Sequence, residues 1–162
     1  MPAVLNLLRI KNLALVEELE WQIAPGFTAI TGETGAGKSI IIGALQLLLG
    51  ERADKSLIRT GADTCTAEAV FTGKELQKLN PQLVEAGVEA STDDLIIKRT
   101  LSAAGNNRQF INGSPTTLSI LKNVGDEVCR INFSDLMTKE IELLFARGFS
   151  RVERCVFGRQ RL

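Results

Sequence analysis

Histidine is absent from the 162 residues of this chain. Its absence excludes histidine general bases, Ser-His-Asp triads and histidine metal ligands. Cysteine is scarce, odd in number and never arranged as C-x-x-C, which argues against a disulfide framework and fits a reducing compartment. We expect the cysteines to be buried as small apolar side chains rather than to bind a metal. They are Cys65, Cys129 and Cys155.

Net charge is also lacking, because 19 basic residues balance 19 acidic ones. Composition alone therefore gives no reason to expect nucleic acid or an anionic membrane as a partner. The charges are unevenly placed. Residues 139–162 hold six basic and three acidic side chains, a net charge of +3, which leaves −3 for the rest of the chain.

No apolar run is long enough to cross a bilayer. The longest, residues 40–49, is short and is interrupted by Gly43 and Gln46. The N-terminus also lacks a basic stretch followed by a long apolar run, the pattern of a signal peptide. We therefore expect a cytoplasmic protein with no membrane partner.

Alternating apolar and polar residues indicate several short strands. They are expected at residues 5–10, 14–23, 27–31, 65–71, 95–101 and 108–111, with a weaker candidate at 128–133. Turns are expected at Pro25-Gly26, at residues 105–107 and at Asn112-Gly113.

Helices are expected at residues 38–49, 74–86 with a break at Pro81, 114–124 and 135–147. The first has apolar residues on nearly every side, so it should be buried under a sheet, and Gly50 can end it in a left-handed conformation. Ser114 and Pro115 have the residue types of a helix N-cap and first helical position, and Gly125 is typical of a helix end.

Residues 32–39, G-E-T-G-A-G-K-S, match the phosphate-loop (Walker A) pattern G-x-x-x-x-G-K-[ST] in full. An expected strand precedes them and an expected helix follows, as the motif requires. Backbone N–H groups of such a loop bind phosphate oxygens, and the helix directs the positive end of its dipole at them. The alternative, a glycine turn with a merely solvated lysine, does not explain this order of elements. We therefore expect ATP and Mg²⁺ to bind here.

Each position of the loop has a physical role. The three glycines suit a tight turn in which the backbone must approach the phosphates closely. Lys38 should bridge the β- and γ-phosphates, and the Ser39 hydroxyl should be a ligand of Mg²⁺. The expected nucleotide-binding residues are Gly32, Glu33, Thr34, Gly35, Ala36, Gly37, Lys38, Ser39 and Ile40.

Hydrolysis needs a further Asp at the end of an apolar strand, to complete the magnesium shell (Walker B). No expected strand of this sequence ends in an apolar run followed by Asp or Glu. The best one, residues 95–97, is followed by Lys98. The sequence thus supports nucleotide binding and assigns no catalytic residue.

Several further segments agree with the loop in one respect: together they resemble the N-terminus of the RecN family of bacterial DNA repair proteins. These segments are residues 8–17, 48–54, 57–62, 68–71 and 108–113. The resemblance runs from about Leu5 to Val128. It implies an α/β P-loop NTPase fold, namely the N-terminal lobe of an ABC/SMC-type ATPase head with a mixed sheet. In that family a long coiled coil joins this lobe to a C-terminal lobe, which supplies the signature motif and the magnesium Asp.

The resemblance also implies partners. Two heads of the family sandwich ATP in a head-to-head homodimer, and the full-length protein acts on DNA in double-strand break repair by recombination. ATPase activity is implied for that full-length protein and stays open for this chain.

Beyond Val128 the chain departs from the family, which continues with a His- and Gln-rich segment that includes the Q-loop. Here C-R-I-N-F stands at residues 129–133. We therefore expect a head lobe at 1–128 and a divergent basic tail at 129–162, as a frameshift or truncation would leave. Two alternatives remain: a small stand-alone P-loop metabolite kinase, or a non-functional remnant.

Overall fold

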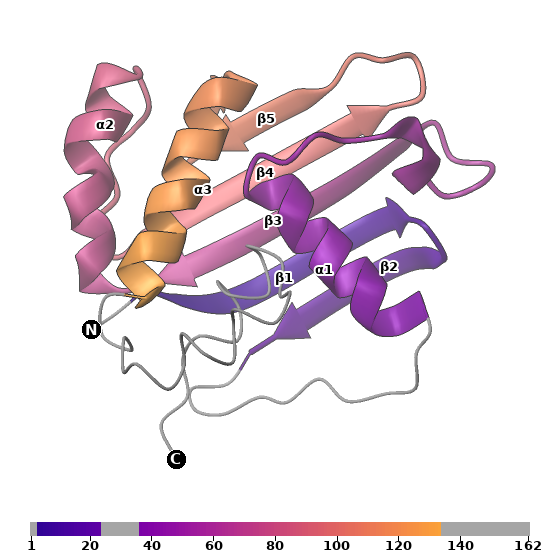
Figure 1. Ribbon diagram of the computed structural model, residues 1–162, viewed down its shortest axis with the longest axis horizontal. Coiled ribbons are helices and arrows are strands. Elements are labelled where there is room, and N and C mark those ends of the chain that lie inside the picture. The colour runs from indigo at the N-terminus through magenta and orange to yellow at the C-terminus, as the bar shows by residue number, and fades with distance from the viewer. Residues whose placement is uncertain (1–2, 24–35, 134–162) are drawn as a thin grey trace, which may run out of the picture.

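The computed structural model describes residues 3–23 and 36–133 (Figure 1). The expected strand at 27–31, loop residues 32–35 and the expected helix at 135–147 lie outside these ranges. So does most of the expected tail.

One six-stranded sheet forms the base of the molecule, with the strand order β2-β1-β3-β4-β5-β6. Every pairing between these strands is antiparallel. The strands are β1 (Val4–Leu13), β2 (Val16–Gln22), β3 (Thr64–Thr72), β4 (Asp94–Ser102), β5 (Arg108–Ile111) and β6 (Ser114–Thr116).

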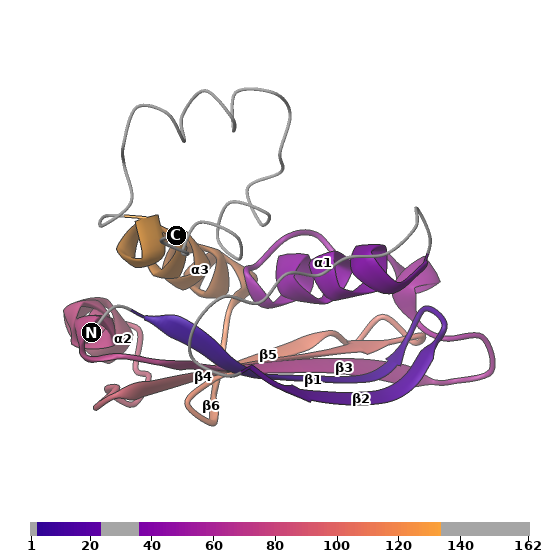
Figure 2. The ribbon, with the colours of Figure 1, turned by 90° about the horizontal axis from the view of Figure 1, so that it is seen from below.

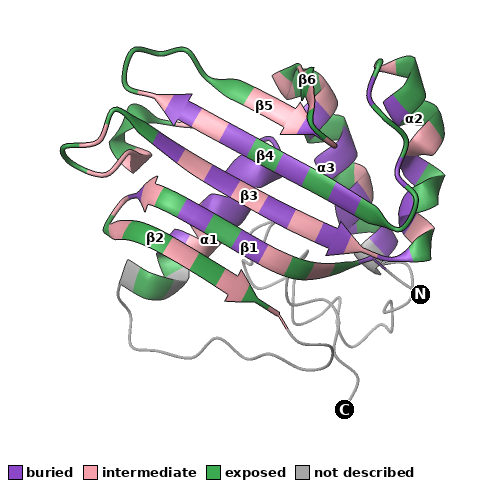
Figure 3. Cartoon of the chain, turned by 180° about the vertical axis from the view of Figure 1, so that it is seen from behind, coloured by how far each residue is buried: buried purple, intermediate pink, exposed green. Residues whose placement is uncertain are grey.

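Two helices, α1 (Ala36–Leu48) and α3 (Leu118–Phe133), lie side by side on one face of the sheet (Figure 2). The short α2 (Asn80–Glu85) follows a 3-10 helix at Lys74–Leu79, and a second 3-10 helix spans Lys55–Leu57. The opposite face of the sheet carries no described helix (Figure 3). The core therefore lies between the sheet and α1 with α3.

The pattern of burial along the strands follows from the helices covering only one face of the sheet. Residues of β3 and β4 alternate strictly between buried and more exposed positions, because successive side chains point to opposite faces (Figure 3). Among the described residues, no helix combines the length and apolarity needed to span a membrane.

The structure confirms the expected strands along β1 to β5 and the helix at α1, with small shifts at their ends. It also confirms the turn at Asn112-Gly113, where both residues have positive φ, 49° and 78°. That turn makes Ser114 and Pro115 part of β6 instead of a helix start, so the expected N-cap is wrong.

The helix expected to close at Gly125 runs on instead. α3 begins at Leu118, passes through Gly125 and takes in residues 128–133, where a strand was the weaker candidate. Its buried positions Leu121, Val124, Val128 and Ile131 recur at helical spacing. This period continues across the expected boundary at residue 128, and the division into lobe and tail stays a prediction.

Only Cys65 is a free thiol among the described residues. It is buried on β3, and burial raises the pKa of its thiol. Cys129 is also buried, on α3, and is disulfide-bonded. The expected burial is therefore confirmed for Cys65 and Cys129, and the expectation of no disulfide is wrong for Cys129.

The Asn112 side chain joins three segments around the β5–β6 turn. Its Oδ1 accepts a hydrogen bond from the Ile96 amide at 2.9 Å, and its Nδ2 donates to the Glu89 carbonyl and the Ser91 hydroxyl at 3.0 and 3.1 Å. This side chain fixes the loop before β4 to the turn after β5.

Replacing Asn112 by alanine should lower the free energy of unfolding by about 2–3 kcal/mol, because it removes these bonds and places alanine at positive φ. Asn112→Gly keeps the backbone conformation and should cost less. Asn106→Ala, at an exposed turn between β4 and β5, is the control and should be near neutral. Urea denaturation measures all three, and equal losses for Asn112→Ala and Asn106→Ala would refute this role.

Candidate nucleotide-binding site

The first turn of α1 is formed by the second half of the phosphate-loop motif. Gly37, Lys38, Ser39 and Ile40 all lie in the helix that begins at Ala36. Gly37 and Ser39 are exposed, whereas Ile40 is buried against the core. The structure therefore places the second half of the motif at a helix N-terminus, and residues 32–35 lie outside the described ranges.

This helix end suits an anion. The first four N–H groups of a helix have no partner within the helix, and the dipole makes this end positive. No acidic residue lies in the first turn of α1 to neutralise it. A Cβ built on Gly37 would meet no described atom within 4 Å.

The exposed Ser39 hydroxyl is an oxygen donor of the kind that Mg²⁺ accepts, together with phosphate oxygens and water. The described residues contain no cluster of three Asp, Glu, His or Cys side chains that could hold a metal by themselves. The residues present therefore fit a magnesium ion that is bound with a polyphosphate.

The other end of α1 is fixed by its own backbone. The Gly50 amide donates to the Leu47 carbonyl at 3.1 Å, and the Glu51 amide donates to the Gln46 carbonyl at 3.0 Å. With Gly50 at φ +84°, this is a Schellman motif. The prediction that Gly50 ends the helix in a left-handed conformation is confirmed.

At the same point α1 and α3 approach each other closely. A Cβ on Gly50 would lie 2.6 Å from the Lys122 Cα, and a Cβ on Gly125 would lie 2.7 Å from the Leu49 carbonyl oxygen. Both glycines are therefore needed for this contact. This contact holds the C-terminal end of α1 against α3.

A buried arginine adds a third attachment. Arg99, on β4, is 3% exposed and donates from Nη1 to the Leu47 carbonyl at 2.9 Å and to the Glu51 carbonyl. Burial lowers the pKa of its guanidinium, which nonetheless stays protonated in a protein. The sequence analysis missed this residue, although the alternation along β4 places it on the inward face between Ile97 and Leu101.

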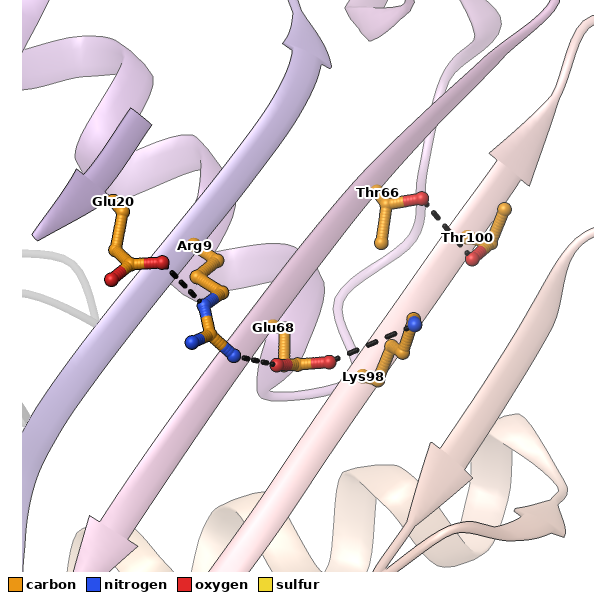
Figure 4. A network of polar contacts seen from close by, with 6 residues as sticks. All are labelled: Arg9, Glu20, Thr66, Glu68, Lys98 and Thr100. Atoms are coloured by element: carbon orange, nitrogen blue, oxygen red, sulfur yellow. Dashed lines mark hydrogen bonds and ion pairs between the residues drawn. The ribbon is translucent and has the colours of Figure 1, made fainter. Parts of the chain in front are cut away.

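The uncovered face of the sheet carries a row of charges that alternate in sign (Figure 4). Arg9 bonds Glu20 at 2.8 Å and Glu68 at 3.0 Å, and Lys98 lies 3.7 Å from Glu68. The bond to Glu20, more than the one to Glu68, raises the pKa of Arg9. Since these pairs are partly exposed and mutually neutralised, they stabilise the strand register only slightly and offer no net charge to a ligand.

A hollow of about 500 Å³ opens between α2 and α3. Its lining includes Glu85 and Asp126. Acidic side chains repel phosphate, so this hollow does not suit a nucleotide.

A protein-family model described as "AAA domain" matches residues 7–152. The DNA repair protein RecN of Vibrio cholerae is 38% identical over 140 residues, which are 84% of this chain and 25% of the relative. RecN of Streptomyces coelicolor is 36% identical over 125 residues, 77% of this chain and 22% of the relative. This chain thus spans about a quarter of the length of these relatives.

Solved structures of two other proteins have a similar fold. A structure from a study of ATP-driven dimerization and DNA-stimulated activation of SMC ATPases has a TM-score of 0.62 at 20% identity, over 93% of this chain and 95% of that chain. The recombination mediator RecF of the RecFOR pathway has a TM-score of 0.59 at 16% identity, over 74% of this chain and 30% of that chain.

These likenesses confirm the expected fold class, a P-loop NTPase lobe of the ABC/SMC type. Among the described strands the pairing is purely antiparallel, and the strand expected at 27–31 lies outside them. The chain belongs to the AAA domain family and is a RecN-like member of it.

Proposed function

We propose that this chain binds ATP with Mg²⁺ through residues 32–40 and serves as the N-terminal lobe of a RecN-like ATPase head in DNA double-strand break repair and recombination. One observation carries the proposal. The phosphate-loop motif ends in the exposed first turn of α1, where no acidic side chain opposes a polyphosphate. The RecN relatives supply the biological setting.

The partners follow from the same resemblance. We propose that the complete protein pairs head to head as a homodimer, binds DNA and works in the cytoplasm. Hydrolysis then needs a magnesium-binding Asp and a signature motif from a second lobe, because no expected strand of this sequence ends in an apolar run followed by Asp or Glu. The stand-alone metabolite kinase is not favoured, since the relatives are DNA repair proteins.

The test is equilibrium binding of ATP, ADP and inorganic tripolyphosphate to the purified chain by calorimetry, with and without Mg²⁺. We expect saturable binding that is strongest for ATP with Mg²⁺. Absence of binding under all conditions would instead favour a non-functional remnant. Turnover that depends on an added metabolite would favour the kinase.

Ser39→Ala separates the metal from the phosphates. We expect it to weaken affinity for ATP in the presence of Mg²⁺ by about tenfold, the effect of losing one ligand or hydrogen bond of roughly 1.4 kcal/mol. Affinity measured in EDTA should change little. Ser56→Ala, at an exposed position outside the loop, is the control. An equal loss with and without Mg²⁺ would contradict the metal-binding role of Ser39.

A further inference from the structure

Arg99 occupies a position that the pattern of β4 reserves for an apolar side chain. Its inward-facing neighbours along the strand are Leu95, Ile97 and Leu101, all buried. A guanidinium there must give up its hydration, which costs free energy unless partners replace the water. Among the described residues, no carboxylate lies within ion-pair distance of Arg99.

Its partners are instead the carbonyls at the end of α1. Nη1 of Arg99 donates to the Leu47 carbonyl, in the last turn, and to the Glu51 carbonyl just past it. The Leu47 carbonyl also accepts from the Gly50 amide, but a carbonyl oxygen has two lone pairs, and the negative end of the helix dipole attracts a cation. The last turn of α1 holds no basic residue of its own. Arg99 supplies that cation from the sheet.

The opposite end of the same helix is the candidate phosphate site. α1 has 13 residues, so Ala36 and Leu48 lie about 18 Å apart along a straight helix axis. Such a helix moves as a unit, so a change of position or tilt at Leu47 is carried to Gly37 and Ser39. A displacement of about 1 Å is enough to weaken contacts that depend on aligned N–H groups.

We propose that Arg99 is a positioning residue for the nucleotide. It holds the C-terminal end of α1 against β4 and thereby places the N–H groups of the first turn where phosphate oxygens bind. Arg99 does this without contacting the nucleotide. The inference rests on the proposed function, because it concerns the affinity of that same site.

A purely structural role makes a different prediction. If Arg99 only stabilises the fold, its replacement lowers the free energy of unfolding and leaves the affinity of the folded protein unchanged. If Arg99 positions α1, affinity falls in protein that is fully folded. The two roles separate when affinity is compared with that of a variant of equal stability.

The test uses Arg99→Met, Arg99→Lys and the control Leu83→Ala in the 162-residue chain. Leu83 is fully buried on α2, so its truncation destabilises a different part of the core. Urea denaturation identifies conditions in which each variant is folded. Calorimetry then gives the dissociation constant for ATP with Mg²⁺ under those conditions.

We expect Arg99→Met to weaken ATP binding by about tenfold, Arg99→Lys by roughly threefold and Leu83→Ala not at all. Amide hydrogen exchange beyond the first turn of α1, where the N–H groups are bonded within the helix, should also rise in Arg99→Met without nucleotide. Wild-type affinity in Arg99→Met, or an equal loss in Leu83→Ala, would overturn the positioning role. If Arg99→Met does not fold, Arg99→Lys against Leu83→Ala decides by the same criterion.

Lys38→Ala distinguishes a failure of the positioning role of Arg99 from a failure of the proposed function. Binding that is lost in Lys38→Ala and unchanged in Arg99→Met overturns only the positioning role. A wild-type chain that does not bind ATP, or a Lys38→Ala variant that binds as well as wild type, overturns the proposed function and the inference with it.

Discussion

Replacing Lys38 by alanine should weaken ATP binding by about 100-fold or more, while the free energy of unfolding changes little. The proposed role of this lysine is to bridge the β- and γ-phosphates, and loss of a charge-assisted contact to a bound anion costs roughly 2–5 kcal/mol. Gly37 and Ser39 on either side are exposed, so these two positions contribute little to the core. Calorimetry with ATP and Mg²⁺ measures the first effect and urea denaturation the second.

The matched control is Lys74→Ala. Lys74 is exposed at the start of the 3-10 helix before α2, so its loss changes the net charge by the same amount outside the loop. It should bind ATP like the wild type. Equal affinities of Lys38→Ala and wild type would show that residues 32–39 do not form the phosphate site.

Gly50→Ala should destabilise the fold by about 2–5 kcal/mol, the sum of two separate costs. Its φ of +84° disfavours any residue with a Cβ, and that Cβ would lie 2.6 Å from the Lys122 Cα and 2.7 Å from the Lys122 amide nitrogen. These are backbone atoms of α3, so they cannot move aside without shifting the helix.

Gly61→Ala isolates the first cost. Gly61 has φ +87°, and a Cβ there would meet nothing within 4 Å, so its replacement should cost only about 1–2 kcal/mol. Gly125→Ala isolates the second cost, because Gly125 lies inside α3 and its Cβ would meet the Leu49 carbonyl oxygen at 2.7 Å. Equal losses for Gly50→Ala and Gly61→Ala in urea denaturation would contradict the close contact between the helices.

The elements that could be predicted from sequence are those in which local pattern and burial agree. β3 and β4 alternate because one face of the sheet is covered by helices, and the same alternation is visible in the sequence. α1 follows the loop motif and ends at a glycine with the expected conformation. The candidate site could be predicted for the same reason, since its groups are adjacent along the chain.

The errors come from residues whose type fits two local structures. Ser114 and Pro115 are typical of a helix start, yet the turn at Asn112-Gly113 directs them back along β5, where they pair. Gly125 is typical of a helix end, yet it lies inside α3 because another helix passes against it. In both cases a contact distant in sequence decides, and a single sequence does not show such a contact.

Arg99 illustrates what remains hidden even where the pattern is correct. The alternation of β4 shows that this residue points inward, but its partners are two carbonyls roughly fifty positions earlier in the chain. Only the packing of α1 on the sheet brings them together. The residue that attaches the candidate site to the sheet was therefore absent from the sequence prediction.

The central claim is that the first turn of α1 and the loop before it bind the phosphates of ATP. The most direct test is the backbone amide spectrum of the ¹⁵N-labelled chain during titration with ATP and Mg²⁺. We predict saturable chemical-shift changes concentrated at residues 32–40, with little change along α2. Unchanged shifts at those residues at saturating ATP, or changes centred on the hollow between α2 and α3, would contradict the account.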